Sequence, residues 1–266
     1  DDCQALVKNA FMDKELNKHM RLTSANSINV ARFLPQAFYY FNAYAQIMKE
    51  QGARSKEQDI VMCVPSGNFG NICAALFGHA MGLPIKRFIA ANNANDIFYK
   101  YLQTGIYEPK PTKATLANAM DVGDPSNFAR IIDLYARYEV RGTRCEESVT
   151  DNSEDIHKRI TSLISGATYN DEQIKDTMRR CYKETGYILD PHGACGYQAL
   201  KEQLKQGEIG IFCETAHPAK FKEKVDAILD TDIEIPERLA AFMKGKKQSV
   251  EMSKNFADFK AFLMKQ

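Results

Sequence analysis

Residues 59–83, which read DIVMCVPSGNFGNICAALFGHAMGL, decide the fold of this chain. The stretch opens with a short apolar run and then breaks into a polar turn with two glycines at residues 65–71. From Ile72 onward, apolar residues recur at helical spacing until Gly82. This pattern predicts a buried strand, a glycine loop and a helix in direct succession.

A polar glycine loop at the start of a helix is suited to bind an anion. The first helical N–H groups have no partner within the helix, the macrodipole adds partial positive charge there, and Gly67 and Gly70 let the backbone approach a ligand closely. Phosphate is the natural ligand. The loop matches no nucleotide-binding signature, because Asn71 stands where a Walker loop has its lysine and no Gly-x-Gly-x-x-Gly is present. The alternative is a tight turn capped by Ser66 or Asn68, with no ligand.

A second short apolar strand, residues 85–91, follows the first after a single helix. Such a unit places its two strands side by side and parallel, with a right-handed crossover. Because ligands of open parallel sheets bind at the carboxyl ends of the strands, we expect the loop 66–71 at the ligand-binding edge. The pattern predicts an α/β fold of three layers, in which a mostly parallel twisted sheet is flanked by helices.

Periodicity and turn residues predict further elements along the chain. We expect helices over residues 2–10, 35–52, 124–135, 152–166, 170–186, 191–207, 218–228 and close to the C-terminus, and strands over residues 187–190 and 209–213. Residues 92–123 show a weak pattern and are too long for an ordinary connection. We expect them to form an insertion or a cover over the site.

The composition excludes several classes of function. With 35 basic and 34 acidic residues, the chain has no field that would attract nucleic acid or an anionic membrane. No apolar run approaches the roughly 20 residues of a membrane span. The seven cysteines are scattered, without metal-binding spacing or a signal peptide, so we expect reduced thiols in a cytoplasmic protein without a metal. The chain starts at Asp1 and shows helical spacing at once, so we expect the C-terminal part of a longer protein.

Six short segments, in order along the chain, resemble those of the threonine synthases. They are residues 26–32 (NSINVAR), 66–71 (SGNFGN), 87–91 (RFIAA), 120–127 (MDVGDPSN), 190–194 (DPHGA) and 215–221 (TAHPAKF). This family converts O-phospho-L-homoserine and water to L-threonine and phosphate, with pyridoxal 5'-phosphate as cofactor. The resemblance implies the same activity and a fold similar to the β subunit of tryptophan synthase.

The resemblance also implies roles for particular residues. The cofactor's phosphate would lie on the loop formed by Ser66, Gly67, Asn68, Phe69, Gly70 and Asn71, and Thr215 would hydrogen-bond the pyridine nitrogen. The substrate's phosphate would be held by Ser27 and Arg32, with Asn26 and Asn29 lining the same pocket. An arginine suits this task because its planar fork matches a tetrahedral dianion. From the residues alone, the pattern of residues 26–32 is also typical of a capped turn before a helix, and Thr215 could be an N-cap.

The lysine that such chemistry needs has no matching position in this chain. In the family it binds the cofactor as a Schiff base and lies upstream, ahead of the segment that corresponds to Asp1. The contexts around Lys222 and Lys260 are similar, but both lie at the wrong end of the chain. We therefore expect no catalytic residue of this kind here, a missing N-terminal segment of the same polypeptide, and no turnover by the chain alone.

The resemblance suggests three parts of the chain. Residues 1–34 would be a remnant of a smaller domain with the substrate-phosphate segment, residues 35–230 the large cofactor domain, and residues 231–266 a helical surface segment. Two other functions remain open: a module that binds phosphorylated metabolites without catalysis, and a related serine or threonine dehydratase. Asp121 and His192 have side chains suited to catalysis, but a capped helix start would account for Asp121, and for His192 we favour a hydrogen-bonded wall residue.

Overall fold

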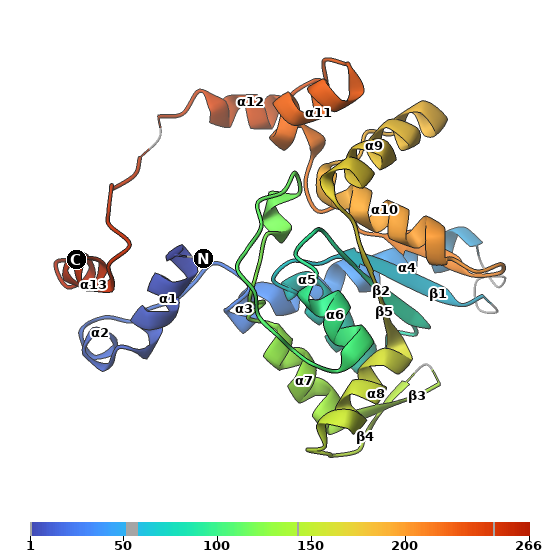
Figure 1. The fold of residues 1–266 in the computed structure, drawn as a ribbon, viewed down its shortest axis with the longest axis horizontal. Coiled ribbons are helices and arrows are strands. Elements are labelled where there is room, and N and C mark those ends of the chain that lie inside the picture. The colour runs from blue at the N-terminus through green and yellow to red at the C-terminus, as the bar shows by residue number, and fades with distance from the viewer. Residues whose placement is uncertain (1, 52–57, 143, 247) are drawn as a thin grey trace. The chain divides into compact units, whose positions relative to one another are not determined.

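The computed structural model describes residues 2–51, 58–142, 144–246 and 248–266 (Figure 1). The chain divides into two compact units, one of residues Asn26–Glu234 and one of Asp1–Ala25 with Ile235–Gln266. Among the described residues, no helix combines the length and the apolar character that crossing a membrane requires. The boundaries expected at residues 34 and 230 stay predictions.

A four-stranded parallel sheet forms the centre of the larger unit. Its strands lie in the order β5 (Ile164–Thr168), β2 (Arg87–Asn92), β1 (Ile60–Pro65) and β6 (Ile209–Phe212). Val61 pairs with Arg87, Ile60 with Ile209, and Phe88 with Ile164. The expected parallel neighbours, β1 and β2, are confirmed, and so is the class of a mostly parallel sheet between helices.

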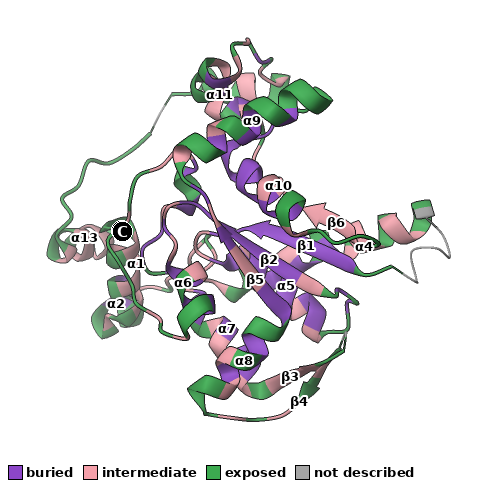
Figure 2. Cartoon of the chain, turned by 45° about the vertical axis from the view of Figure 1, so that its right-hand side comes forward, coloured by how far each residue is buried: buried purple, intermediate pink, exposed green. Residues whose placement is uncertain are grey.

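The two faces of the sheet are covered by different helices. Alternate residues such as Met62, Val64 and Phe88 enter the main hydrophobic core together with α5 (Gly70–Ala80), α6 (Ile97–Thr104), α7 (Phe128–Arg137) and α8 (Ser153–Leu163). The other face lies under α10 (Pro191–Gln203), against which α9 (Asp171–Thr185) packs (Figure 1). β1 is buried along its whole length, as Figure 2 shows, because helices cover it on both sides.

Several helix boundaries follow from local capping residues, as expected. Asn152 caps α8, Asn170 and Gln173 form a capping box at the start of α9, and Gly186 ends α9 with a φ of 73°. The helix expected over 35–52 is a 3₁₀ turn, Leu34–Gln36, followed by α4 (Ala37–Gln51). Its expected last residue, Gly52, lies outside the described residues. The expectation that this helix is largely buried is wrong, because among its described residues Ala37 and Tyr40 are buried, whereas Phe38 is 71% exposed.

Several expectations about elements are wrong, and one helix and one hairpin form where none was expected. The helix expected to reach Gly166 ends at Leu163, because the next residues pair with β2 as strand β5. Residues 187–190 form no strand, since Gly186 closes one helix and Asp190 caps the next. Helix α7 begins at Phe128, after the predicted start at Asp124. Residues 92–123 contain helix α6, and β3 (Tyr138–Arg141) with β4 (Arg144–Glu147) forms an unexpected hairpin.

The described residues of the smaller unit form four helices. They are α1 (Asp2–Met12), α2 (Lys14–His19), α12 (Glu237–Met243) and α13 (Phe256–Leu263). Asp13 caps α2, and its Oδ2 also accepts from Lys260 Nζ at 2.9 Å. Lys260 pairs with Glu15 as well, at 2.7 Å, so the two ends of the chain are joined by ion pairs.

Candidate functional site

The loop between β1 and α5 presents a row of backbone donors. Ser66 N–H donates to Ala91 O, whereas in the described part of the chain the N–H groups of residues 67–71 donate to no protein acceptor. These groups precede the first turn of α5 at the carboxyl end of the central strand. Unpaired N–H groups at a helix N-terminus favour a tetrahedral anion. The loop therefore fits a phosphate group.

Gly67 is required because another segment lies directly against it. A Cβ at Gly67 would lie 2.6 Å from Met120 Cα and 2.9 Å from the carbonyl oxygen of Ala119. Both atoms belong to the 3₁₀ turn η3 (Asn118–Met120), the end of the stretch expected to cover the site. Because backbone atoms cannot move aside cheaply, only glycine fits here.

Neither Ser66 nor Asn68 caps α5, so the simple capped-turn alternative is wrong. The N-cap residue is Phe69, which has a left-handed conformation with a φ of 61° and no side-chain cap. Its ring is buried and lies 4.8 Å from the ring of Phe98. Ser66 Oγ instead donates to Val64 O at 2.9 Å. The left-handed residue is held by packing, and this leaves the helix N-terminus uncapped.

Ser27, from the predicted substrate-phosphate segment, lies on this loop. A Cβ at Gly70 would lie 2.5 Å from Ser27 Cβ. Asn68 Nδ2 donates to Ser27 Oγ at 3.0 Å, and Asn127 Nδ2 donates to the same hydroxyl at 3.2 Å. Asn127 also donates to Asn68 O at 2.8 Å. The structure thus brings together two segments that are about forty residues apart in the sequence.

Arg130 holds the substrate-phosphate segment from α7, and sequence reasoning missed it. Its Nη1 donates to Ser27 O at 3.1 Å and its Nη2 to Ile28 O at 2.6 Å. The guanidinium also lies 4.9 Å from the centre of the Phe33 ring. The available signal was a cation three residues after Asn127, just beyond the segment 120–127 that resembles the family.

The other residues of that segment have turn geometry. Asn29 caps the short helix α3 (Val30–Phe33), and Asn26 Oδ1 accepts from Ile28 N at 3.0 Å. Arg32 is exposed at the last turn of α3. The interpretation as a capped turn before a helix is confirmed, and the role of these residues in a substrate-phosphate pocket stays a prediction.

Thr215 lies in the loop after β6, exposed to solvent. β6 pairs with β1, and Cys213 N donates to Cys63 O at 3.0 Å, so both loops leave the same edge of the sheet. The N-cap of the following 3₁₀ helix η4 (Pro218–Phe221) is His217, so the alternative role of Thr215 as that cap is wrong. Ala216 N–H donates to Asp190 Oδ2 at 3.3 Å, which attaches the loop to the start of α10.

His192 and Asp121 serve as hydrogen-bonded wall residues. His192 Nε2 accepts from Ala119 N at 3.1 Å, and its Nδ1 lies 2.6 Å from Asp190 Oδ1. The ring is therefore neutral with its proton on Nδ1. Asp121 accepts from Asn93, Asn95 and Thr115, which fixes the covering segment to the strand ends. Both side chains are occupied in positioning the backbone.

The two lysines in family-like contexts are held by carboxylates. Lys222 Nζ lies 2.7 Å from Asp226 Oδ2 and 2.8 Å from Ile233 O. Hydrogen bonds with Asp226 and Asp232 raise the pKa of Lys222, and hydrogen bonds with Glu15 and Asp13 raise that of Lys260. A Schiff base needs a neutral amine, so these pairings disfavour both lysines for that chemistry.

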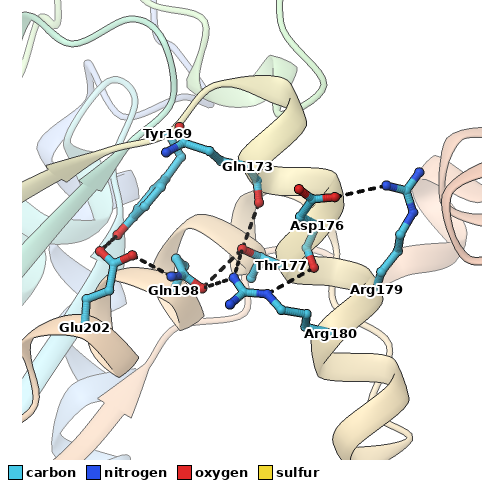
Figure 3. Close-up of a pocket in the computed structure, with 8 residues that line it drawn as sticks. All are labelled: Tyr169, Gln173, Asp176, Thr177, Arg179, Arg180, Gln198 and Glu202. Carbon is cyan, nitrogen blue, oxygen red and sulfur yellow. Dashed lines mark hydrogen bonds and ion pairs between the residues drawn. The ribbon is translucent and has the colours of Figure 1, made fainter.

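A separate pocket of about 560 Å³ lies along α9 and α10 (Figure 3). Its polar groups bind one another: Tyr169 Oη donates to Glu202 at 2.6 Å and Arg180 to Gln198 at 2.8 Å. Figure 3 shows these side chains joined in one network across the two helices. Because the donors and acceptors that line this pocket bind one another, few of them remain to bind a ligand.

Comparisons with known proteins point to a single family. Residues 193–263 match the family model of the C-terminal region of threonine synthase. Curated threonine synthases of Haemophilus influenzae and Escherichia coli are 46% and 42% identical over 100% and 99% of this chain, which spans 56% of each. The crystal structure of E. coli threonine synthase superposes with a TM-score of 0.85, at 43% identity over 100% of this chain and 56% of that one. A threonine synthase from Brucella melitensis with bound pyridoxal phosphate gives 0.81, at 30% identity over 100% of this chain and 57% of that one.

Proposed function

We propose that this chain, which belongs to the threonine synthase family, forms the phosphate-binding part of a pyridoxal-phosphate enzyme that makes L-threonine from O-phospho-L-homoserine and water. The observation that carries the proposal is the row of unpaired N–H groups at residues 67–71, with Ser27 against Gly70. The reaction involves two phosphates, one of the cofactor and one of the substrate. The contact of Ser27 with the loop, which would bring the two phosphates close together, supports it.

The loop of residues 66–71 would hold the cofactor's phosphate. Its N–H groups supply directed donors without a permanent charge, and the N-terminus of α5 adds positive potential. Tyr40 Oη donates to Asn71 O at 2.9 Å and is fully buried, which raises its pKa well above the ordinary value. A neutral phenol keeps this bond at all physiological pH values, so the loop is preorganised before the ligand arrives.

Ser27, Arg32, Asn26 and Asn29 would hold the substrate's phosphate. Asn68 and Asn127 both donate to Ser27 Oγ, so the hydroxyl proton is left to point toward a ligand. Arg32, exposed on α3, supplies the cation that compensates a dianion. Arg130 orients this segment through the carbonyls of Ser27 and Ile28 and leaves the ligand to the other residues.

The hydroxyl of Thr215 would donate one hydrogen bond to the pyridine nitrogen. When bound, pyridoxal 5'-phosphate supplies an electron sink that stabilises negative charge on the substrate's carbons. A hydroxyl partner leaves the ring nitrogen unprotonated, which makes this sink weaker than one beside a carboxylate. The lysine that moves the protons is proposed to come from an upstream segment, since Lys222 and Lys260 are ion-paired.

The proposal is tested by mixing the chain with pyridoxal 5'-phosphate, reducing with borohydride and mapping tagged lysines by peptide mass spectrometry. We expect no specific label in the chain alone. A polypeptide extended upstream of residue 1 should be labelled at one lysine and should release phosphate from O-phospho-L-homoserine. Stoichiometric labelling of Lys220 or Lys222 would contradict the assignment of the lysine. Release of ammonia from serine in preference to phosphate from phosphohomoserine would favour a dehydratase.

A further inference from the structure

The carboxyl group of Glu214, next to Thr215, is buried without a hydrogen-bond donor. A Cβ at Gly193 would lie 2.1 Å from Glu214 Oε1 and 2.3 Å from Oε2, so the group rests on the first turn of α10. Both oxygens are inaccessible to solvent and accept no hydrogen bond from the described residues. An ionised carboxylate would lose its hydration here and gain nothing in return, which strongly disfavours the charged form.

The neighbouring carboxylate of Asp190 is in the opposite situation. Its Oδ1 accepts from the backbone N–H groups of His192 at 2.7 Å and Gly193 at 3.4 Å, and from the ring of His192 at 2.6 Å. Its Oδ2 accepts from Ala216 N at 3.3 Å. As the N-cap of α10 it also lies in the positive potential of the helix. Of two adjacent carboxyl groups, the one with four donors keeps the negative charge and the one with none keeps the proton.

The pKa values of the pair agree with this division. Burial raises the pKa of Glu214 to about 10, and the hydrogen bond and charge of Asp190 add to the effect. Burial opposes the ionisation of Asp190, but its hydrogen bonds with His192 and Glu214 outweigh that and lower its pKa below the ordinary value.

We propose that Glu214 is a positioning residue: a neutral carboxylic acid whose O–H donates to Asp190 and thereby fixes the loop that carries Thr215. The inference rests on the proposed function, in which Thr215 faces the pyridine nitrogen. The loop then has two attachments to α10, the Ala216 N–H and the Glu214 O–H. An ionised Glu214 would place a negative charge one residue from Thr215 and favour protonation of the ring nitrogen. The neutral form of Glu214 adds no negative charge, so the ring nitrogen stays unprotonated and can accept a hydrogen bond from the hydroxyl of Thr215.

The titratable groups around Glu214 come from every neighbouring element. Asp190 and His192 belong to the start of α10, Cys181 to α9, Tyr187 to the segment between these helices, and Cys213 to the end of β6. Burial raises the pKa of Tyr187 and, to about 11, that of Cys213, so both are neutral at physiological pH. The His192 ring is neutral in this hydrogen-bond arrangement. Asp190 therefore carries the charge that Glu214 meets.

The test follows the carboxyl proton and the loop, without cofactor. The chain is labelled with ¹³C at glutamate carboxyls, and the Glu214 resonance is assigned from its loss in Glu214→Gln. We expect it to stay protonated through neutral pH, while Glu208, whose pKa the Arg87 ion pair lowers, is ionised and serves as the matched control. A Glu214 resonance that titrates in the ordinary acidic range would overturn the proposal.

Hydrogen exchange at the Ala216 amide reads the positioning itself. Glu214→Gln should preserve its protection, because the side-chain amide can donate to Asp190 as the acid does. Glu214→Ala should exchange this amide about tenfold faster, the effect of losing one buried hydrogen bond. Equal exchange in the Gln and Ala variants would refute the hydrogen bond. Failure of the wild-type chain and its upstream-extended form to bind pyridoxal 5'-phosphate would refute the proposed function alone, since neither readout here needs the cofactor.

Discussion

The loop after β1 and the loop after β6 leave the same edge of the sheet, but different chemistry holds them. The first is shaped by backbone: Gly67 lies against Met120, Gly70 lies against Ser27, and a left-handed Phe69 opens the helix. The second is held by side chains, through Asp190 and the carboxyl of Glu214. Backbone shape is insensitive to pH, whereas a carboxyl pair depends on one proton. The first loop therefore suits a phosphate site that does not depend on pH. The second suits a site where a nearby charge decides whether the ring nitrogen of the ligand is protonated.

The largest effect is expected where backbone meets backbone, at Gly67. Gly67→Ala places a methyl group 2.6 Å from Met120 Cα, so either the loop or the 3₁₀ turn must shift. We expect a loss of about 3 kcal/mol in the free energy of unfolding, measured by urea denaturation. Affinity for pyridoxal 5'-phosphate, measured by equilibrium dialysis, should fall as well.

Gly78→Ala, inside helix α5, is the matched control, because its Cβ would meet side-chain atoms at ordinary contact distance, of Phe41 at 3.4 Å and of Leu83 at 3.6 Å. This variant should unfold at a urea concentration equal to or above that of the wild type. If both variants behaved alike, the tight contact at Gly67 would not be a constraint on the site.

A smaller effect is expected at Arg130, which joins α7 to the segment around Ser27. Arg130→Met removes two hydrogen bonds to backbone carbonyls, at 3.1 and 2.6 Å, and leaves both acceptors partly buried. We expect the free energy of unfolding to fall by about 2 kcal/mol and the amides near Ser27 to exchange faster, while the 66–71 loop keeps its structure. Arg137→Gln, at an exposed pair with Asp133, should leave the unfolding midpoint unchanged. Unaltered exchange near Ser27 in Arg130→Met would argue against this attachment.

The dependence on pH should separate the two loops. The pKa of Glu214 is about 10 in the folded chain against an ordinary value of 4.5. The folded state therefore holds a proton that the unfolded chain releases, so the stabilisation is complete below pH 4.5 and is lost as pH rises toward 10. Between about pH 6 and about pH 9, we expect the stability of the wild type to fall relative to Glu214→Gln in urea titrations. Parallel pH profiles for the two proteins would exclude a buried proton at this position.

Gly193→Ala should remove the same pH dependence by another route. Its Cβ would occupy the position of the Glu214 carboxyl, which is the end of a flexible side chain and can move out into water. We expect the free energy of unfolding to fall by about 1 kcal/mol near neutral pH, which is less than for Gly67→Ala because no backbone has to shift. The measurement is the same pair of urea titrations. A pH profile like that of the wild type would show that the carboxyl can stay buried elsewhere.

The smallest effect on stability is expected at Thr215, which is exposed. Thr215→Val keeps the shape and removes the hydroxyl, so the unfolding free energy should change by about 0.5 kcal/mol or less. The absorbance spectrum of bound cofactor in the upstream-extended polypeptide should change nevertheless. Thr215→Ser, which retains a hydroxyl, should keep the wild-type spectrum; a spectrum that is unchanged in Thr215→Val would place the pyridine nitrogen elsewhere.

Features that depend on nearby residues could be predicted from the sequence. β1, its glycine loop, α5 and β2 follow from a continuous apolar and glycine pattern, and the caps at Asn152 and Asn170 from single residue types. β5 could not be predicted, since residues 164–168 continue a helical pattern and become a strand only through pairing with β2. The β3–β4 hairpin was not predicted either, although it pairs two neighbouring segments.

The site shows the same division between local and distant information. The resemblance to the threonine synthases selected Ser27 and the 66–71 loop, and the structure places them in contact. Arg130 was missed because it reaches Ser27 across 103 residues of sequence. Glu214 was missed because its proton is determined by Gly193 and Asp190, on another helix. Individual residue types do not reveal such distant partners.

The order of strands in the sheet has a consequence for the growing chain on the ribosome. β2 can pair with β1, and β5 with β2, in the order in which they are synthesised, but β6 pairs with the other side of β1, at Ile60, only when residue 209 has emerged. Until then β1, which is rich in apolar residues, has one unpaired edge, the kind of edge that invites association between chains. When β6 pairs with β1, it covers this edge and at the same time brings in Thr215. Chains whose synthesis is interrupted before β6 should therefore be prone to aggregate.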